Sequence, residues 1–272
     1  YTFTTADQGI HTFSGEVIMK TVGLKAVRVR DYETYSYVIS STVYINVKPG
    51  PLEYFKVEYY PTDTDEVVAG EAKQLKITAY DGQKAYPSGD GNIKTDYTGE
   101  IQFTSNDSQA SLPSNYIFTT TDQGSHVFDN VILKTANQGK GNSSTLWYIT
   151  VTDTQTLKTG TKSDIKVYPA PLYQFIVDVA TGPWTAGVNR GTVTVEAVDQ
   201  FGNRCSIGPN AYDGEIQFNS DASLWDFNPS AYTFDTVTDQ GIHTFDAADG
   251  YGMKISTGGT YYLCLLYTSP SP

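Results

Sequence analysis

One pattern occurs three times along the chain at nearly constant spacing. Each copy starts with Tyr and ends in Asp-Gln-Gly-x-His-x-Phe, and the copies span residues 1–13, 116–128 and 232–245. Consecutive motif aspartates are 115 and then 117 residues apart. A period of this length is that of a whole small domain and not of a single solenoid turn. The chain is therefore a tandem array of domain-sized repeats.

Four further landmarks return in the same order, so the similarity extends over the whole repeat. They are a Pro-x-Pro-Leu segment, an Ala-x-Asp turn with Gly, a Tyr-x-Gly-Glu-Ile-Gln-Phe strand and an alternating strand that ends in Asp. The Pro-x-Pro-Leu copies lie at residues 49–52 and 169–172, and the Asp turns at 79–82 and 197–203. The Tyr-x-Gly-Glu-Ile-Gln-Phe strands lie at 97–105 and 212–220, and the strands that end in Asp at 27–31 and 149–153.

Within one period, short runs alternate between apolar and polar residues. Such runs occur at residues 54–60, 75–80, 100–104, 116–119, 126–133, 146–152 and 165–168. Alternation with a period of two predicts half-buried strands, and the intervening segments are rich in turn-forming Gly, Asp, Asn, Ser and Pro. About seven strands in a repeat of roughly 115 residues predict an all-β fold, a two-sheet sandwich with Greek-key connections.

The Pro-x-Pro segments mark the expected domain boundaries, because proline donates no hydrogen bond to a sheet and stiffens the chain. We expect the C-terminal part of a first repeat at residues 1–49, a complete repeat at 50–169 and a truncated third repeat at 170–263. Short, stiff joints of this kind predict a rod rather than a globule.

The last residues, 264–272, resemble the translation of a sequencing adapter, and we expect them to be a non-native tail on a metagenomic fragment. Cys264 then does not belong to the protein and Cys205 stands alone. We therefore predict no disulfide.

The charge of the chain excludes one class of partner. Eighteen basic and 30 acidic residues give a net charge of -12, which repels a phosphate backbone and predicts no nucleic-acid binding. No run of about 20 apolar residues predicts a membrane span in this fragment.

The repeat resembles the bacterial and archaeal Ig-like domains of large surface proteins, a class that includes invasin-type and filamin-like repeats. The resemblance rests on the turn at residues 197–203, the Tyr-x-Gly-Glu-Ile-Gln-Phe strands and the Asp-Gln-Gly-x-His-x-Phe motif, and it covers residues 1–263. It implies tandem Ig-like β-sandwiches on an exported protein and brings no catalytic residues. The second repeat departs from the pattern, since a longer loop at residues 81–94 replaces the short turn.

All three histidines occupy the same position of the repeated motif, one in each repeat. A zinc site needs three or four ligands around one ion, and residues in separate domains do not converge in this way. We therefore interpret the motif as a structural element of the fold. Its residues are Asp7, Gly9, His11, Phe13, Asp122, Gly124, His126, Phe128, Asp239, Gly241, His243 and Phe245.

Catalytic and ligand-binding candidates are few. Glu100 and Glu215 recur once per repeat, so they do not form the paired carboxylates that a glycosidase needs, and we expect no enzyme activity. Calcium takes six to eight oxygen ligands, for which acidic loop residues are weak candidates, with no other cofactor expected. These residues are Asp63, Asp65, Glu66, Asp90 and Asn92. Trp184, in the first turn of the third repeat, is a weak candidate for contact with a neighbour or a sugar.

These observations favour a structural stalk, spacer or adhesive array in a large exported protein at the cell surface. Its partners are then the neighbouring repeats of the same chain, with host or matrix glycans or proteins as further candidates. The alternative is a glycan- or protein-binding module attached to a secreted enzyme or adhesin, with the loop at residues 81–94 and Trp184 as contact sites.

Overall fold

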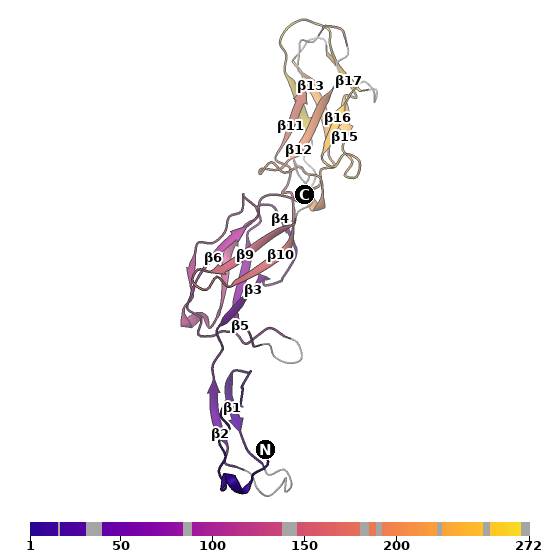
Figure 1. Cartoon of the computed structure of the whole chain (residues 1–272). Helices are drawn as coiled ribbons and strands as arrows, with labels where there is room; N and C mark the ends of the chain where they lie inside the picture. Colours follow the sequence, from indigo (N-terminus) through magenta and orange to yellow (C-terminus); the bar gives the residue numbers. More distant parts are fainter. Residues whose placement is uncertain are drawn as a thin grey trace.

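The computed structural model describes residues 1–15, 17–30, 40–83, 89–137, 146–179, 185–188, 192–221, 225–246 and 251–267. In these residues the protein is all-β, with strands β1 to β18, three short 3-10 turns and no α-helix. The strands form three units that follow one another along an elongated molecule (Figure 1). We call residues 1–49 unit 1, residues 50–169 unit 2 and residues 170–267 unit 3. No helix in the described part is long and apolar enough to cross a membrane.

Unit 2 is a sandwich of two sheets. One sheet has the order β3-β5-β8 and the other β4-β10-β9-β6-β7. Neighbouring strands are antiparallel except β4 and β10, which run parallel. The strands are β3 (Leu52–Tyr60), β4 (Glu66–Val68), β5 (Lys73–Asp81), β6 (Glu100–Ser105), β7 (Tyr116–Ile117), β8 (Ser125–Val131), β9 (Trp147–Asp153) and β10 (Thr159–Tyr168).

The core of unit 2 follows from the alternation in its sequence. In β3, the side chains of Phe55, Val57 and Tyr59 are buried, and the intervening residues are more exposed. They belong to the same core cluster as Ile149 and Val151 of β9 in the other sheet. Each fully buried side chain of this kind contributes roughly 1.5–3 kcal/mol, so this core holds the two sheets together.

The expected strands of unit 2 are present, but some boundaries and one strand differ. Strand β4 is an eighth strand that the sequence did not indicate, because three residues are too few to show alternation. Strand β10 begins at Thr159, six residues before the expected start, since the ladder to β9 continues through polar residues to a register shift between Lys162 and Ile165. Strand β7 has two residues, not the expected four.

Unit 3 repeats the arrangement of unit 2. Its sheets have the orders β11-β12-β16 and β15-β13-β18, with a separate β14-β17 pair, and they enclose a second core that includes Val195, Phe218 and Phe245. The strands are β11 (Gln174–Val179), β12 (Val193–Val198), β13 (Glu215–Ser220), β14 (Trp225–Asn228), β15 (Ala231–Thr233), β16 (Ile242–Phe245), β17 (Gly252–Ile255) and β18 (Leu263–Tyr267).

Strand β18 includes the first residues of the segment that we expected to be a non-native tail. Leu265 lies opposite Phe218 of β13, as Val151 lies opposite Phe103 in unit 2. The segment therefore takes the place of β9 in unit 3. Strand pairing does not reveal the origin of a segment, so the adapter interpretation stays a prediction, and residues 268–272 lie outside the described part.

Unit 1 contains one antiparallel pair, β1 (Gly23–Val27) and β2 (Val43–Val47), and the 3-10 turn η1 (Thr5–Asp7). These correspond to β9, β10 and the turn η2 (Thr120–Asp122) of unit 2. The strand expected at residues 27–31 is instead β1, which ends at Val27, although Val29 still accepts an N–H bond from Ser40 (2.9 Å). Residues 31–39 lie outside the described part.

Candidate functional site

The joint between units 2 and 3 is built around a buried carboxylate. Asp199 follows β12, and only 1% of its surface is exposed. Its Oδ2 accepts the N–H of Ala170, the middle residue of the Pro-x-Pro segment, at 2.8 Å. Its Oδ1 accepts the N–H groups of Phe201 (2.8 Å) and Asn203 (2.9 Å). The carboxylate thus ties the linker to the turn that opens unit 3.

Asn203 carries the contact across this joint. Its Nδ2 donates to the carbonyl of Lys134 (2.8 Å), and its Oδ1 accepts the N–H of Ala136 (2.9 Å). Both partners belong to unit 2, so one amide pairs with a donor and an acceptor of the same backbone segment. Asn203 Nδ2 also lies 2.8 Å from Asp199 Oδ2, which fixes the orientation of the amide.

We call residues 134–136 the acceptor segment of unit 2. Asp107 holds this segment from within the unit, because its carboxylate accepts the N–H groups of Lys134 (2.7 Å) and Thr135 (3.1 Å) and the Thr135 hydroxyl (2.6 Å). Asp107 is 3% exposed. The segment that receives Asn203 is thus held by contacts within unit 2.

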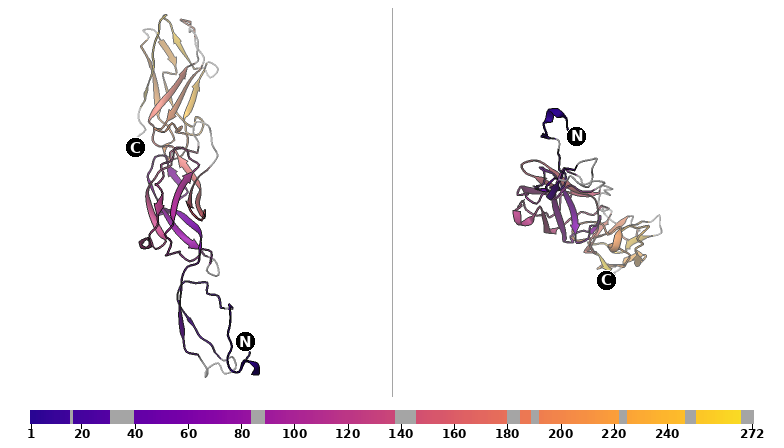
Figure 2. Two further views of the ribbon diagram at one scale, coloured as in Figure 1. Left: turned by 60° about the vertical axis from the view of Figure 1, so that its left-hand side comes forward. Right: turned by 90° about the horizontal axis from the view of Figure 1, so that it is seen from below.

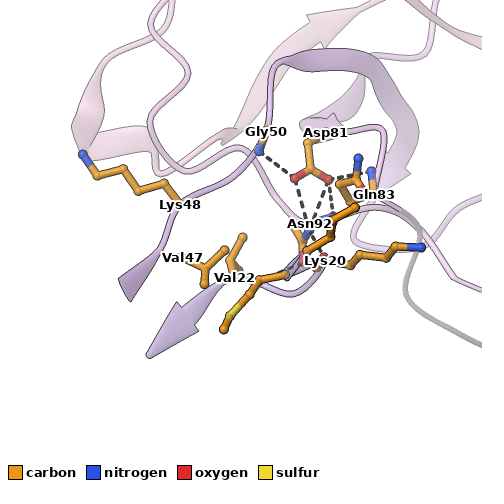
Figure 3. A pocket seen from close by; sticks show the side chains of 10 residues that line it. Lys20, Val22, Val47, Lys48, Gly50, Asp81, Gln83 and Asn92 are labelled. Carbon is orange, nitrogen blue, oxygen red and sulfur yellow. Dashed lines mark hydrogen bonds between the residues drawn. The ribbon is translucent and has the colours of Figure 1, made fainter. Parts of the chain in front are cut away.

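The joint between units 1 and 2 has the same construction (Figure 3). Asp81 is 1% exposed and accepts the N–H of Gly50, the middle residue of the first Pro-x-Pro segment, at 2.8 Å. Asn92 Nδ2 donates to the carbonyl of Lys20 (2.9 Å), and Asn92 Oδ1 accepts the N–H of Val22 (3.4 Å). Residues 20–22 are thus the acceptor segment of unit 1.

The two joints have the same hydrogen-bond pattern although their turns differ in length. Ten residues separate Asp81 from Asn92, whereas three separate Asp199 from Asn203. The acceptor segments are Lys-Thr-Val in unit 1 and Lys-Thr-Ala in unit 2. The same set of hydrogen bonds therefore forms twice around different loops, and we call these two sites joint 1–2 and joint 2–3.

The charge state of Asp81 in joint 1–2 depends on these hydrogen bonds. Burial alone would raise the pKa of Asp81, but the N–H groups of Gly50, Asn92 and Gln83 and the Asn92 side chain together hold the pKa of Asp81 below its usual value. The carboxylate is then ionised at neutral pH. An ionised acceptor makes stronger hydrogen bonds than a neutral one.

A pocket of about 200 Å³ lies beside joint 1–2. Its wall includes Met19, Val22 and Val47 as well as Asp81 and Asn92. Ligand pockets are usually about 300–1,000 Å³, and Asp81 and Asn92 in this wall already bind backbone groups and each other. The pocket is better described as the flank of the joint than as a ligand site.

Each Asp-Gln-Gly-x-His-x-Phe motif forms a compact cluster inside its own unit. In unit 2, Asp122 Oδ1 accepts the Tyr116 hydroxyl (3.1 Å) and lies 2.9 Å from Nδ1 of His126, while its Oδ2 accepts the N–H of Thr119 (2.7 Å). The Tyr116 and His126 rings stack with centroids 4.2 Å apart. Burial raises the pKa of Asp122, but the hydrogen bonds outweigh it and lower this pKa to about 2.

The other copies of the motif have the same contacts. In unit 3, Asp239 accepts the Tyr232 hydroxyl (3.1 Å) and lies 2.7 Å from Nδ1 of His243. In unit 1, Asp7 accepts the Tyr1 hydroxyl (2.6 Å) and lies 3.3 Å from His11. The motif phenylalanines Phe128 and Phe245 are buried, whereas Phe13 is 43% exposed.

The motif also supports the joints through its glycine. The carbonyl of Gly124 accepts the N–H of Ala79, and the carbonyl of Gly241 accepts the N–H of Ala197, both at 2.8 Å. Each alanine lies two residues before a joint aspartate. Gly9, Gly124 and Gly241 have φ of +83°, +77° and +78°, a left-handed conformation that glycine adopts readily. The motif thereby holds the strand that presents the joint.

The calcium candidates make contacts with other protein groups. Lys162 Nζ lies 3.0 Å from Asp63 and 2.5 Å from Asp65. Asp90 lies 3.2 Å from Lys56 Nζ, and Glu66 accepts the Tyr168 hydroxyl at 2.9 Å, while Asn92 belongs to joint 1–2. The described residues include no group of three or more His, Cys, Asp or Glu that could hold a metal. Trp184 lies outside the described residues.

The joints were not identified from the sequence, although parts of them were visible there. The Pro-x-Pro segments and the Asp turns were recognised as recurring landmarks, but no pattern connected them. The missing signal was the Lys-Thr pair at residues 20–21 and 134–135. Its role is hard to see because Asn92 and Asn203 bind the backbone of this segment.

Comparison with known proteins gives little further information. No protein-family model and no curated protein matches the chain. Among solved structures, domains 4–9 of the surface layer protein SbsC are 17% identical with a TM-score of 0.27, over 90% of this chain and 34% of that chain. The S-layer protein rSbsC(31-844) is 15% identical with a TM-score of 0.29, over 96% and 35%.

A Parabacteroides merdae beta-glucuronidase is also similar, at 11% identity with a TM-score of 0.23, over 80% of this chain and 25% of that chain. The chain thus spans about a third of the length of the S-layer chains and a quarter of the glucuronidase. TM-scores this low do not establish a shared fold.

Proposed function

We propose that the chain is part of a stalk of tandem Ig-like repeats in an exported cell-surface protein, and that it acts as a mechanical spacer. The observation that carries this proposal is the repeated joint. A chain that only needs to connect independent domains requires a flexible linker, whereas this chain fixes each linker to the next unit with a buried carboxylate.

The Ig-like class is supported by the connectivity of unit 2. A three-stranded sheet packs on a five-stranded one, and β4 runs parallel to β10 at the edge, so the chain crosses between sheets near its start. Ig-like sandwiches of about 100 residues have two such sheets joined by Greek-key connections. Unit 3 has the corresponding β11-β12-β16 and β15-β13-β18 sheets.

The strength of one joint suits a spacer. The two bonds of Asn203 to unit 2 contribute about 0.5–1.5 kcal/mol each, and the bond from Ala170 to the Asp199 carboxylate about 1.5–3 kcal/mol. The two bonds of Asn203 favour one orientation of the neighbouring units, and the bond of Ala170 holds the linker to unit 3. The strands of nine and ten residues in unit 2 make this complete repeat roughly 30 Å long. The units follow one another in series (Figure 2), so fixed joints add about this length for every complete repeat.

The proposal assigns no enzyme activity and no ligand to the chain. The alternative, a glycan- or protein-binding module, relied on Trp184 and the loop at residues 81–94. Trp184 lies outside the described residues, and the described ends of the loop are bound at Asp81, Asp90 and Asn92. No contact in the described part favours the alternative over a spacer.

A surface-display experiment tests the spacer function. The whole chain is placed between a cell-surface anchor and an epitope on cells that carry a thick polysaccharide coat, and antibody access to the epitope is measured. We expect access to fall for Asn203→Asp, which weakens joint 2–3 without changing chain length, and to be kept for Asn219→Asp at an exposed site. Equal access for wild type and both variants would contradict the proposal.

The location is tested separately. Mild trypsin treatment of intact cells that produce the protein should release peptides of this chain if it lies at the cell surface. Release only after lysis would contradict a surface location.

A further inference from the structure

The two joints carry different side chains at the second residue after the joint aspartate. Phe201 follows Asp199 by two residues, and Gln83 follows Asp81 by two residues. Both backbone N–H groups donate to the joint carboxylate, at 2.8 and 3.1 Å. The two side chains therefore start from equivalent points, one aromatic and one polar.

Phe201 belongs to unit 3 but packs against the core of unit 2. Its ring covers Gly70, which has φ of +79° and follows β4. A Cβ atom at Gly70 would lie 2.5 Å from two carbons of the ring. The absence of a side chain at Gly70 thus creates a notch in unit 2, and the Phe201 ring fills it.

A second aromatic ring makes the reverse contact. Tyr168, at the end of β10 in unit 2, lies against Gly208 of the turn η3 (Gly208–Asn210) in unit 3, where a Cβ atom would clash with the ring. Asn210 Nδ2 of the same turn donates to the carbonyl of Pro169 at 2.9 Å. Joint 2–3 therefore has one ring from each unit on a glycine of the other.

Joint 1–2 has polar residues in both places. Gln83 stands at the position of Phe201. Lys48 precedes the first Pro-x-Pro segment as Tyr168 precedes the second, so Lys48 stands at the position of Tyr168. Only five residues lead from Asn92 to Tyr97, against nine from Asn203 to Tyr212, and unit 2 has no turn that corresponds to η3 in its described residues.

We infer that the two ring-on-glycine contacts make joint 2–3 a rigid interface, whereas joint 1–2, in whose described residues the side-chain contacts between the units are the hydrogen bonds of Asn92, is the pivot at which the stalk bends. The far end of unit 2 is then a docking surface for a particular partner: a following repeat whose turn carries Phe two residues after the joint Asp and a Gly opposite Tyr168. This inference rests on the proposed stalk function and adds an order of stiff and yielding joints to it.

Distances between spin labels test the inference on the whole chain. Gln102 and Gln217 are exposed and occupy equivalent positions in units 2 and 3, and Ala26 is exposed in unit 1. Replacing Gln102 and Gln217 by Cys reports on joint 2–3, and replacing Ala26 and Gln102 reports on joint 1–2. Cys264 is replaced by Ser. Cys205 is buried, and burial raises the pKa of its thiol to about 12, so it stays unlabelled.

We expect a narrow distance distribution across joint 2–3 and a broad one across joint 1–2. Phe201→Gln, which copies joint 1–2, should lower the ratio of docked to undocked joints about 10-fold, as expected for exposing one partly buried aromatic ring. The distribution across joint 2–3 then broadens. Tyr168→Lys should do the same from the opposite unit, which separates loss of docking from damage to unit 3.

Tyr173→Gln is the matched control, because Tyr173 is a neighbouring aromatic residue that is 64% exposed, and it should leave the distribution narrow. Two narrow distributions in the wild type would overturn the inference but not the proposed stalk function. Two broad ones would overturn both. A narrow joint 2–3 that neither Phe201→Gln nor Tyr168→Lys changes would overturn the role of the rings alone.

Discussion

Replacement of Asn203 by Asp tests the joint with a side chain of the same shape. The change turns the Nδ2 donor into an acceptor that faces the Lys134 carbonyl and the Asp199 carboxylate, each 2.8 Å from Nδ2 in the wild type. The Oδ1 atom can still accept the N–H of Ala136. The substitution therefore removes two hydrogen bonds and places two carboxylates side by side in a buried site.

The expected cost follows from these two bonds. The bond to a neutral carbonyl contributes about 0.5–1.5 kcal/mol, and the bond to a carboxylate about 1.5–3 kcal/mol. Their sum is about 2–4.5 kcal/mol before the repulsion between the carboxylates. With a urea dependence of about 1–3 kcal/mol per molar for a small domain, the unfolding midpoint of unit 3 should fall by roughly 0.7–4.5 M.

Urea unfolding followed by tryptophan fluorescence and circular dichroism measures this shift. Asn219→Asp introduces the same charge at an exposed position of β13 and should change the midpoint little. The cost of Asn203→Asp should also shrink at acidic pH, because one of two adjacent carboxylates then takes up a proton. Equal midpoints for the two variants, or a cost independent of pH, would refute the assigned role of Asn203.

Three further predictions concern the units. The pKa of Asp122 is lowered to about 2, so its contribution to the stability of unit 2 is present above the unfolded pKa of about 4 and is lost as the pH falls toward 2. The melting temperature of unit 2 should therefore drop over this pH range, and Asp122→Asn should make this drop smaller. Gly124→Ala should destabilise unit 2 by more than the roughly 1–2 kcal/mol that a left-handed alanine costs, because the new Cβ would clash with the Lys94 carbonyl. Gly187 is the control, since it has φ of +80° and no neighbour within 4 Å, and Gly187→Ala should cost no more than that amount. A smaller loss of stability for Gly124→Ala than for Gly187→Ala would contradict this. Calcium and a chelator should give the same melting temperature for unit 2, since Lys162 holds Asp63 and Asp65, and a rise in the melting temperature with calcium would contradict this.

The strands of this protein are readable from its sequence because each buries one face. Residues 54–60 and 146–152 alternate strictly enough to predict β3 and β9, and the repeated motif marks the start of β8 and β16. Strand β4 is not predictable from the sequence because its three residues pair with β10 far along the chain. No local pattern records such a pairing.

The joints were hidden for a different reason. Asp199, Gly202 and Asn203 are ordinary turn residues, and nothing in their spacing indicates that the amide of Asn203 faces the previous unit. The insertion of Phe201 into the Gly70 notch is equally unreadable, since the two residues are 131 positions apart. Contacts between units depend on the relative orientation of the sandwiches. The alternation of residues within a strand carries no information about that orientation.

Small-angle scattering of the whole chain in solution shows whether the three units form an extended rod. Three units of roughly 30 Å joined end to end make a rod of about 90 Å, with a radius of gyration of about 26 Å. Repeats joined in fixed series predict this value, and Asn203→Asp should lower it. A compact chain of this length has a radius of gyration of about 18 Å, and that result for the wild type would contradict the account.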